Sequence, residues 1–262
     1  MNKIEQVADY RDEDGFSALF YKTQDNSMTV SIVSEKMQTE MMHSQSGSFS
    51  ETNYVYLPVV DFVIKNRIEP VFLSIGLGVG YIEIMLFAYL LNKNISDDYL
   101  SQLFIFSFEK EEKLIQFFTA FLLDQPLPVS FQACYSSILQ LNSEYFSVDK
   151  MELKLFIKDF ILKNKFVIYN KFTNETQLTK PANGIFFDAF SANSSPDLWN
   201  ELYIDNILSP KNCSSSSSFA TYASKNMLKR KLKENNFNLL KKKGFAGKRE
   251  CIFAYRIKNE LI

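Results

Sequence analysis

A short apolar run that ends in a glycine-rich turn constrains this chain most. Residues 71–75 read Val-Phe-Leu-Ser-Ile, glycines follow at positions 76, 78 and 80, and a second apolar run extends from Tyr81 to Ala88. The first run predicts a buried strand and the second a helix. Glycine permits positive φ angles and a close approach of the backbone to a ligand, so the unit predicts a nucleotide-like ligand at the helix N-terminus. An ordinary strand-turn-helix corner is the alternative, because G-x-G-x-G alone is a weak motif.

Further apolar runs alternate with helical segments after this unit. We expect four more strands, in residues 103–108, 153–157, 184–187 and 219–222. Residues 237–240 and 251–256 are expected to close the chain as a β-hairpin. Repeated strand and helix units followed by a hairpin predict an α/β fold. Its seven-stranded sheet should be mostly parallel, with an antiparallel strand at the C-terminus.

The segments between and before these strands complete the expected organisation. Turn residues Asp25-Asn26 lie between two β-prone runs and predict a small N-terminal hairpin, so we divide the chain into an extension, residues 1–57, and a Rossmann-like domain, residues 58–262. Ser214–Ser218 is expected to form a turn. Helices are predicted in residues 59–66, 196–202 and 226–235, and over about forty residues after Glu109, with an interruption at Pro126 and Pro128.

Acidic side chains follow three of the expected strands. Glu109 comes after the second strand, where a carboxylate can accept hydrogen bonds from ribose hydroxyls. Asp159 follows the third, where a carboxylate can accept from an adenine amino group. Asp188 emerges from the fourth, at the edge where open α/β sheets bind ligands. Each acid has an alternative interpretation as the cap or first-turn acid of the next helix.

The charge distribution is uneven, although the net charge is only −1. Residues 225–249 contain ten basic residues and one acid, Glu234. This tail is interpreted either as a solvated helix face or as a phosphate-contacting surface. Three scattered cysteines suit a reducing, cytoplasmic compartment, no apolar run is long enough to span a bilayer, and neither the cysteines nor the lone His43 forms a metal-binding pattern.

Several motifs, in this order along most of the chain, resemble the methyltransferase domain of the MnmC family of bacterial tRNA wobble-uridine modification enzymes. Two of them are Phe187-Asp188-Ala189-Phe190 and the closing Lys243-Gly244-Phe245-Ala246-Gly247-Lys248-Arg249-Glu250. The others are the glycine turn, Phe108-Glu109-Lys110, Thr23–Thr29, His43-Ser44 with Glu51, Tyr54-Val55-Tyr56, Pro196-Asp197-Leu198-Trp199 and Ala220-Thr221-Tyr222. The chain is similar to the single-domain members of this family, which lack the flavin oxidoreductase half.

The resemblance implies a Rossmann-like class I enzyme that uses S-adenosyl-L-methionine to methylate the 5-aminomethyl group of the tRNA wobble uridine. It implies that Asp188 is catalytic and that the anticodon arm of tRNA meets Lys243, Lys248 and Arg249. A separate enzyme would supply the aminomethyl-uridine, and neither a metal nor a membrane is implied. The residues implied to bind the cofactor are Gly76, Leu77, Gly78, Gly80, Glu109, Lys110, Asp159, Asp188 and Phe190.

The chain departs from the family pattern in three places. Ser74 stands where the family usually has an acid, two residues before the first glycine. Ala192, Ser194 and Ser195 replace a segment with a proline and a Lys-Asn pair, and the stretch Pro210–Ser218 replaces a Pro-Gly-Gly sequence. Two other functions therefore stay open. One is a methyltransferase acting on a small metabolite or a protein, and the other is a noncatalytic RNA-binding relative of the fold.

Overall fold

The chain forms two compact units that are interleaved along the sequence. The computed structural model describes residues 4–33, 40–190, 195–247 and 250–258. One unit comprises residues 1–53, 77–94 and 111–164, and the other comprises residues 54–76, 95–110 and 165–262. Helix α1 (Ser48–Lys65) begins in the first and ends in the second. The domain boundary that we predict between residues 57 and 58 falls inside this helix.

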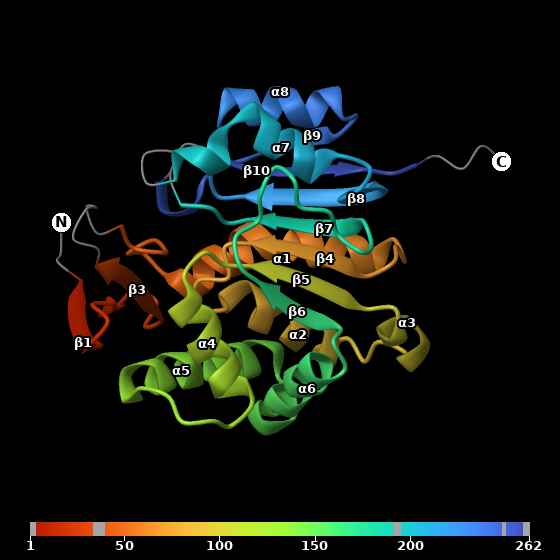
Figure 1. The fold of residues 1–262 in the computed structure, drawn as a ribbon. Coiled ribbons are helices and arrows are strands. Elements are labelled where there is room, and N and C mark those ends of the chain that lie inside the picture. The colour runs from red at the N-terminus through yellow and green to blue at the C-terminus, as the bar shows by residue number, and fades with distance from the viewer. Residues whose placement is uncertain (1–3, 34–39, 191–194, 248–249, 259–262) are drawn as a thin grey trace. The chain divides into compact units, whose positions relative to one another are not determined.

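A seven-stranded sheet organises the second unit (Figure 1). Strands β6, β5, β4, β7 and β8 pair in parallel in that order, and β10 pairs antiparallel with both β8 and β9. The predicted α/β fold, with its mostly parallel sheet and antiparallel C-terminal strand, is confirmed. The strands are β4 (Val71–Ile75), β5 (Phe104–Phe108), β6 (Phe166–Tyr169), β7 (Ala182–Phe187), β8 (Cys213–Thr221), β9 (Asn238–Lys242) and β10 (Cys251–Arg256).

Both faces of this sheet are covered within the second unit, as its apolar central strands require. Every residue of β4 and β7 is buried. On one face, Leu73 and Phe187 belong to a core that includes residues of α7 (Glu201–Leu208) and α8 (Asn226–Glu234). On the other, the Phe72 and Phe186 rings stack with centroids 5.8 Å apart, and Tyr56 of α1 meets Phe186 edge-on. Short helices α3 (Asp97–Ser101), η1 (Pro196–Trp199) and η2 (Phe245–Gly247) complete the unit.

The carboxyl ends of the parallel strands lie level with one another. The Gly76 amide donates to the Phe108 carbonyl over 2.9 Å, and the Asp188 amide donates to the Ile75 carbonyl over 2.9 Å. The Glu109 amide donates to the Tyr169 carbonyl over 3.0 Å. Residues that follow four neighbouring strands are therefore brought to one edge of the sheet.

The first unit combines a small antiparallel sheet with helices. The turn around Asp25 confirms the predicted hairpin, and its carboxylate accepts from the amides of Ser27 (3.1 Å) and Ser50 (2.9 Å), which ties the turn to the start of α1. The Glu51 side chain likewise accepts from the Ser44 amide over 2.8 Å. The elements are β1 (Glu5–Arg11), β2 (Ser17–Lys22), β3 (Met28–Val33), α2 (Tyr81–Asn92), α4 (Glu112–Leu122), α5 (Val129–Phe146) and α6 (Lys150–Leu162).

Several local predictions are wrong or incomplete. Residues 153–157 belong to helix α6, which is capped by Asp149, and the third strand of the sheet is β6, further along the chain. Ser214–Ser218 is not a turn but part of strand β8. Helix α1 begins at Ser48 and contains Pro58, and the predicted helix 196–202 is the short helix η1 followed by α7. Among the described residues, no helix is both long and apolar enough to cross a membrane.

Candidate functional site

Gly76 sets the geometry at the edge of the sheet. Its φ is +99°, and a Cβ added there would lie 2.4 Å from the Asp188 carbonyl oxygen. Any other residue would push against the backbone carbonyl of Asp188, whose amide is hydrogen-bonded to Ile75 of β4. The glycine therefore allows the chain after β4 to pass directly beside the residue that ends β7, and this holds Asp188 at a fixed height on the edge.

The Asp188 side chain is held by a residue from α1. The Tyr56 hydroxyl donates to Asp188 Oδ1 over 2.5 Å, although the two residues are 132 positions apart in the sequence. Tyr56 is 2% exposed, so its ring is fixed by packing. A short hydrogen bond from a hydroxyl to a carboxylate is of the strong, charge-assisted kind. Sequence reasoning missed this partner, and the only signal for it was its place in the Tyr54-Val55-Tyr56 motif.

The two residues after Asp188 are also fixed. Ala189 accepts a hydrogen bond at its carbonyl from the Tyr222 hydroxyl over 2.9 Å, and Phe190 accepts one from the Trp199 indole over 2.7 Å. The Lys110 ammonium lies 6.0 Å from the centre of the Phe190 ring. Lys110, Asp188 and Phe190, which the resemblance assigns to the site, are thus brought together. Of the three replaced residues nearby, Ser195 is buried, whereas Ala192 and Ser194 lie outside the described residues.

The other two acids predicted to follow strands, Glu109 and Asp159, lie in different kinds of position. Glu109 directly follows β5 and is only 8% exposed, as a ribose-binding acid in this position would be. Asp159 does not follow a strand. It lies in α6, where its half-exposed carboxylate pairs with Lys163 over 2.7 Å. The strand-end argument for an adenine contact therefore fails for Asp159, and Asn170 is the residue that follows the third strand.

The glycines of the turn differ in the space that an added side chain would have. Gly80 precedes α2 with a φ of +77°, and an added Cβ would lie 2.2 Å from the Phe118 ring. Gly78 has a φ of +52°, and the nearest atom to an added Cβ is Met42 Sδ at 3.4 Å. Gly80 is thus required by packing inside the first unit, whereas at Gly78 an added Cβ would meet, among the described residues, the flexible end of Met42. Leu77, between the first two glycines, is buried.

The residues of this edge fit S-adenosyl-L-methionine. Ser74 lies two residues before Gly76 and is 1% exposed. Its Oγ has no hydrogen-bond partner in the described part of the chain. Buried hydroxyls are normally hydrogen-bonded, so an unpartnered one beside a predicted ligand site suits a polar ligand. Glu109, which is 8% exposed at the end of β5, suits a ribose diol. The chemistry of these groups matches the amino end and the ribose of this cofactor.

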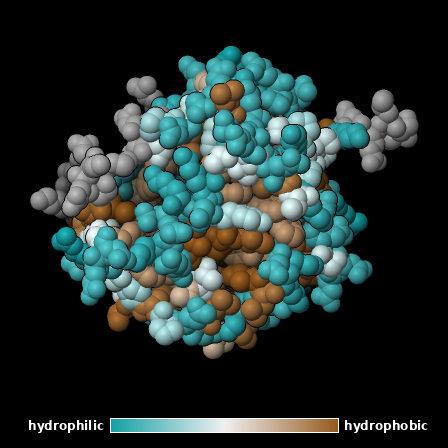
Figure 2. All heavy atoms as spheres, viewed as in Figure 1, coloured by the Kyte–Doolittle hydropathy of each residue, from teal (hydrophilic) through white to brown (hydrophobic). Residues whose placement is uncertain are grey.

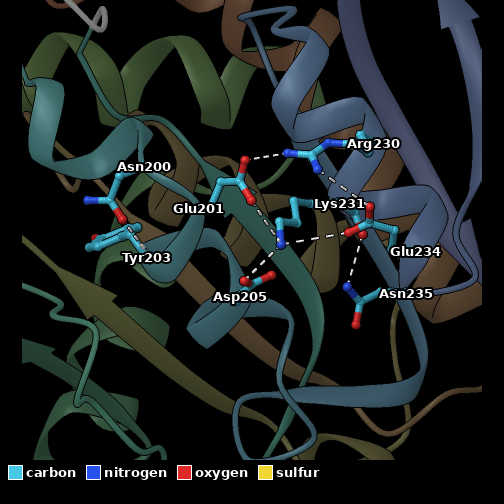
Figure 3. A network of polar contacts seen from close by, with 8 residues as sticks. All are labelled: Asn200, Glu201, Tyr203, Asp205, Arg230, Lys231, Glu234 and Asn235. Carbon is cyan, nitrogen blue, oxygen red and sulfur yellow. Dashed lines mark hydrogen bonds and ion pairs between the residues drawn. The ribbon is translucent and has the colours of Figure 1, made fainter.

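The basic tail carries less free charge than its composition suggests (Figure 3). Arg230 pairs with Glu201 and Glu234. Lys231 contacts Asp205 over 2.9 Å, with Glu201 and Glu234 also within ion-pair distance. Half of the positive charge of α8 is therefore matched by acids of α7 and α8. The network does not include Lys225 or Lys233 of this region, which are exposed.

The end of β9 is a second basic region. The Lys242 ammonium lies 3.8 Å from the centre of the Tyr54 ring and donates to the Tyr54 carbonyl, and burial lowers the pKa of this lysine. Lys243 is exposed, and its carbonyl accepts from the Tyr54 hydroxyl over 2.8 Å. Lys248 and Arg249, the other two expected tRNA contacts, lie outside the described residues. Lys229 is paired with Glu250.

A groove of about 400 Å³ lies over the face of β5 and β6, where Figure 2 shows apolar surface. The Phe108 and Tyr169 rings stack in its floor with centroids 5.3 Å apart. Its rim is the loop after β6, residues 170–179, rather than a helix. Asn206 of α7 donates to the carbonyls of Thr173 and Thr176, both over 2.9 Å, so this loop has a fixed shape.

Comparisons with known proteins agree with this geometry. Residues 131–257 match the model of a family described as S-adenosyl-L-methionine-dependent methyltransferase. The fold is similar to MnmC2 from Aquifex aeolicus, with 17% identity over 91% of this chain and 69% of that one, and a TM-score of 0.57. It is also similar to spermidine synthase from Thermotoga maritima, with 9% identity over 97% of this chain and 75% of that one, and a TM-score of 0.52.

The likenesses to solved structures establish the Rossmann-like fold. The family match over residues 131–257 supports an S-adenosyl-L-methionine-dependent methyltransferase. The fold by itself does not select the chemistry, because one of the two neighbours is a spermidine synthase. The choice of acceptor must be argued from the residues at the edge of the sheet.

Proposed function

We propose that this S-adenosyl-L-methionine-dependent methyltransferase of the MnmC type methylates the amino nitrogen of the 5-aminomethyl group on the tRNA wobble uridine. The observation that carries the proposal is the Asp188 carboxylate at the carboxyl end of β7, beside Gly76 and hydrogen-bonded to Tyr56. A carboxylate held in this way offers a directed acceptor to the N–H groups of an amine. The product is 5-methylaminomethyl-uridine.

The protein's task in this reaction is positioning. The bound cofactor supplies a methyl group on a sulfonium, so no nucleophile of the protein is needed. Glu109 would hold the ribose, Ser74 would contact the polar end of the cofactor, and Asp188 would accept a hydrogen bond from the amine. The proton that the nitrogen loses on methylation would pass to Asp188 or to water. An ordinary aspartate is a weak base, with a pKa of ~3.9, so orienting the nitrogen is the larger contribution.

The tRNA meets the basic residues near β9 and α8. Exposed Lys243 is suited to contact backbone phosphates, whereas Arg230 and Lys231 are occupied by acids of the protein. Phosphate contacts make binding weaker as salt rises. Chemistry on a base in the anticodon requires that the nucleotide be turned out of the stack to reach the edge of the sheet. We therefore expect salt-sensitive tRNA binding that depends on Lys243 more than on Lys231.

Labelled methyl transfer tests the proposal. The acceptor is tRNA with an unmethylated 5-aminomethyl wobble uridine, and the same tRNA without the aminomethyl group is the control. Asp188→Asn should lower kcat by at least about a hundredfold while cofactor affinity, measured by calorimetry, changes little. Asp197→Asn, at an exposed acid of η1, is the matched control and should retain full activity. No transfer to the aminomethylated tRNA, or near-normal turnover by Asp188→Asn, would overturn the proposal.

A small amine is the second candidate acceptor. It is favoured by the ion pairs that neutralise much of α8 and by the structural similarity to a spermidine synthase. The same assay with spermidine as acceptor separates the two, because only the tRNA reaction should respond to Lys243→Ala. A noncatalytic RNA-binding protein would bind tRNA without binding the cofactor.

A further inference from the structure

The hydrogen bond between Tyr56 and Asp188 assigns a role to a residue that is far from Asp188 in the sequence. We infer that Tyr56 is a positioning residue, which fixes the Asp188 carboxylate in the orientation that receives the acceptor nitrogen. The inference rests on the proposed function, because it concerns how Asp188 performs its part of that reaction. It adds a specific requirement for the phenol hydroxyl.

The geometry of the pair supports this role. The two oxygens are 2.5 Å apart, so the hydroxyl of Tyr56 is committed to Asp188 as a donor. The Tyr56 ring is 2% exposed and packs edge-on against Phe186, with centroids 6.1 Å apart. A buried ring in contact with the sheet cannot swing away from the carboxylate without opening the core.

Both ends of the pair are anchored in the sheet. On the tyrosine side, the Val59 carbonyl of α1, one turn further along, accepts from the Ser218 hydroxyl of β8 over 3.3 Å. On the aspartate side, the amide of Asp188 bonds to Ile75, and the carbonyl of Ala189 bonds to Tyr222. The hydrogen bond therefore joins two rigid elements, and it restricts rotation of the Asp188 carboxylate about the Cβ–Cγ bond.

The chemical consequence is a preference for a methyl acceptor that can donate a hydrogen bond to Asp188. A phenol donor stabilises a carboxylate over its protonated form, so the pair presents Asp188 as a hydrogen-bond acceptor. An amine nitrogen, which carries N–H groups, satisfies that acceptor and is aligned by it. Without the phenol, the carboxylate loses this restraint on its orientation, and the nitrogen spends less time in the reactive position.

Tyr56→Phe is the direct test, because it removes the hydroxyl and keeps the ring against Phe186. We expect kcat with aminomethylated tRNA to fall about ten- to a hundredfold, while KM for the tRNA and the dissociation constant of the cofactor change less than about twofold. Tyr99→Phe is the matched control. Its hydroxyl donates to the Ile68 carbonyl before β4, at the opposite end of that strand, and kcat should not change.

A double variant separates positioning from general damage. In the Asp188→Asn background, Tyr56→Phe should cost less than about a further twofold in kcat, because its effect acts through the carboxylate. If the two losses multiply, or if Tyr56→Phe alone keeps wild-type kcat, the inference is overturned.

A spectroscopic readout makes the inference independent of the acceptor. In protein labelled with ¹³C at the aspartate carboxyl groups, the Asp188 resonance is identified by its absence in Asp188→Asn. Tyr56→Phe should shift this resonance, and Tyr99→Phe should not. An unmoved resonance overturns the inference even where tRNA is methylated. A moved resonance in a protein that does not methylate tRNA overturns only the proposed function.

Discussion

Replacing Gly80 by alanine tests whether the glycine turn is constrained by packing or by a ligand. At Gly80 two costs combine. An L-residue in the left-handed region costs about 1–2 kcal/mol, and the new Cβ would lie 2.2 Å from Phe118 Cε2, with two further ring atoms within 2.9 Å. Phe118 is fully buried, so its ring has no free space to move into. Overpacking of this kind costs about 1–3 kcal/mol, which gives a total of about 2–5 kcal/mol for Gly80→Ala.

Gly78→Ala supplies the matched control, because it shares the backbone cost without the clash. Among the described residues, its Cβ would meet the flexible end of Met42 at 3.4 Å, so about 1–2 kcal/mol is expected. Urea unfolding of the ligand-free protein measures both values. In a Phe118→Leu background, which removes the ring, the cost of Gly80→Ala should fall to that of Gly78→Ala. Equal costs for the two alanines, or no effect of Phe118→Leu on the difference, would refute the reasoning.

Two further predictions concern the polar groups around the strand ends and the first helix. Ser74→Ala should leave the ligand-free protein as stable as wild type or slightly more stable, because the hydroxyl has no hydrogen-bond partner among the described residues. It should weaken S-adenosyl-L-methionine binding several-fold by calorimetry, and unchanged affinity would exclude a cofactor contact by this hydroxyl. For Asp25, burial opposes ionisation, but hydrogen bonds from Ser27, Thr23 and Ser50 outweigh it and lower the pKa. A pKa that is lower in the folded than in the unfolded protein stabilises the fold at pH values above the unfolded-state pKa of ~3.9. This stabilisation is lost as the pH falls through the folded-state pKa. Asp25→Ala should therefore cost about 1 kcal/mol at pH 7, and the gap to wild type should close below pH ~4; a gap that does not depend on pH would contradict this account.

The fold was predictable where one periodicity dominates. The continuous apolar run of β4 and the turn after it specify a buried parallel strand, and the structure buries all five of its residues. The segment Leu153–Ile157 shows the limit of this reasoning. Its apolar residues read as a strand in a short window, but the buried positions are Leu153, Ile157 and Phe160, which follow helical spacing. Asp149 then caps the helix by accepting from the amides of Met151 and Glu152.

The serine-rich strand illustrates tertiary context overriding local propensity. Ser217 and Ser218 are not among the β-branched and aromatic residues that favour strands, yet both are fully buried in β8. Their hydroxyls donate to the carbonyls of Ser214 (2.9 Å) and Val59 (3.3 Å), so both buried hydroxyls are hydrogen-bonded. The Tyr56–Asp188 pair was equally hidden, because a sequence gives no distance between residues 132 positions apart.

The departures from the MnmC pattern differ in how close they lie to the reactive edge. Ser214 and its neighbours form the amino end of β8, where Cys213 pairs with Ala182 at the start of β7. Asp188 follows the other end of β7, so the serine stretch changes the edge of the sheet opposite to the one that carries the carboxylate. Ser74 is different, because it lies two residues before Gly76, at the reactive edge, and is buried there. We therefore expect the change of acid to serine to act on how the cofactor is held. Gly76 and Tyr56, which position Asp188, are not among the replaced residues, although Ser218 of the serine stretch bonds to the Val59 carbonyl of α1.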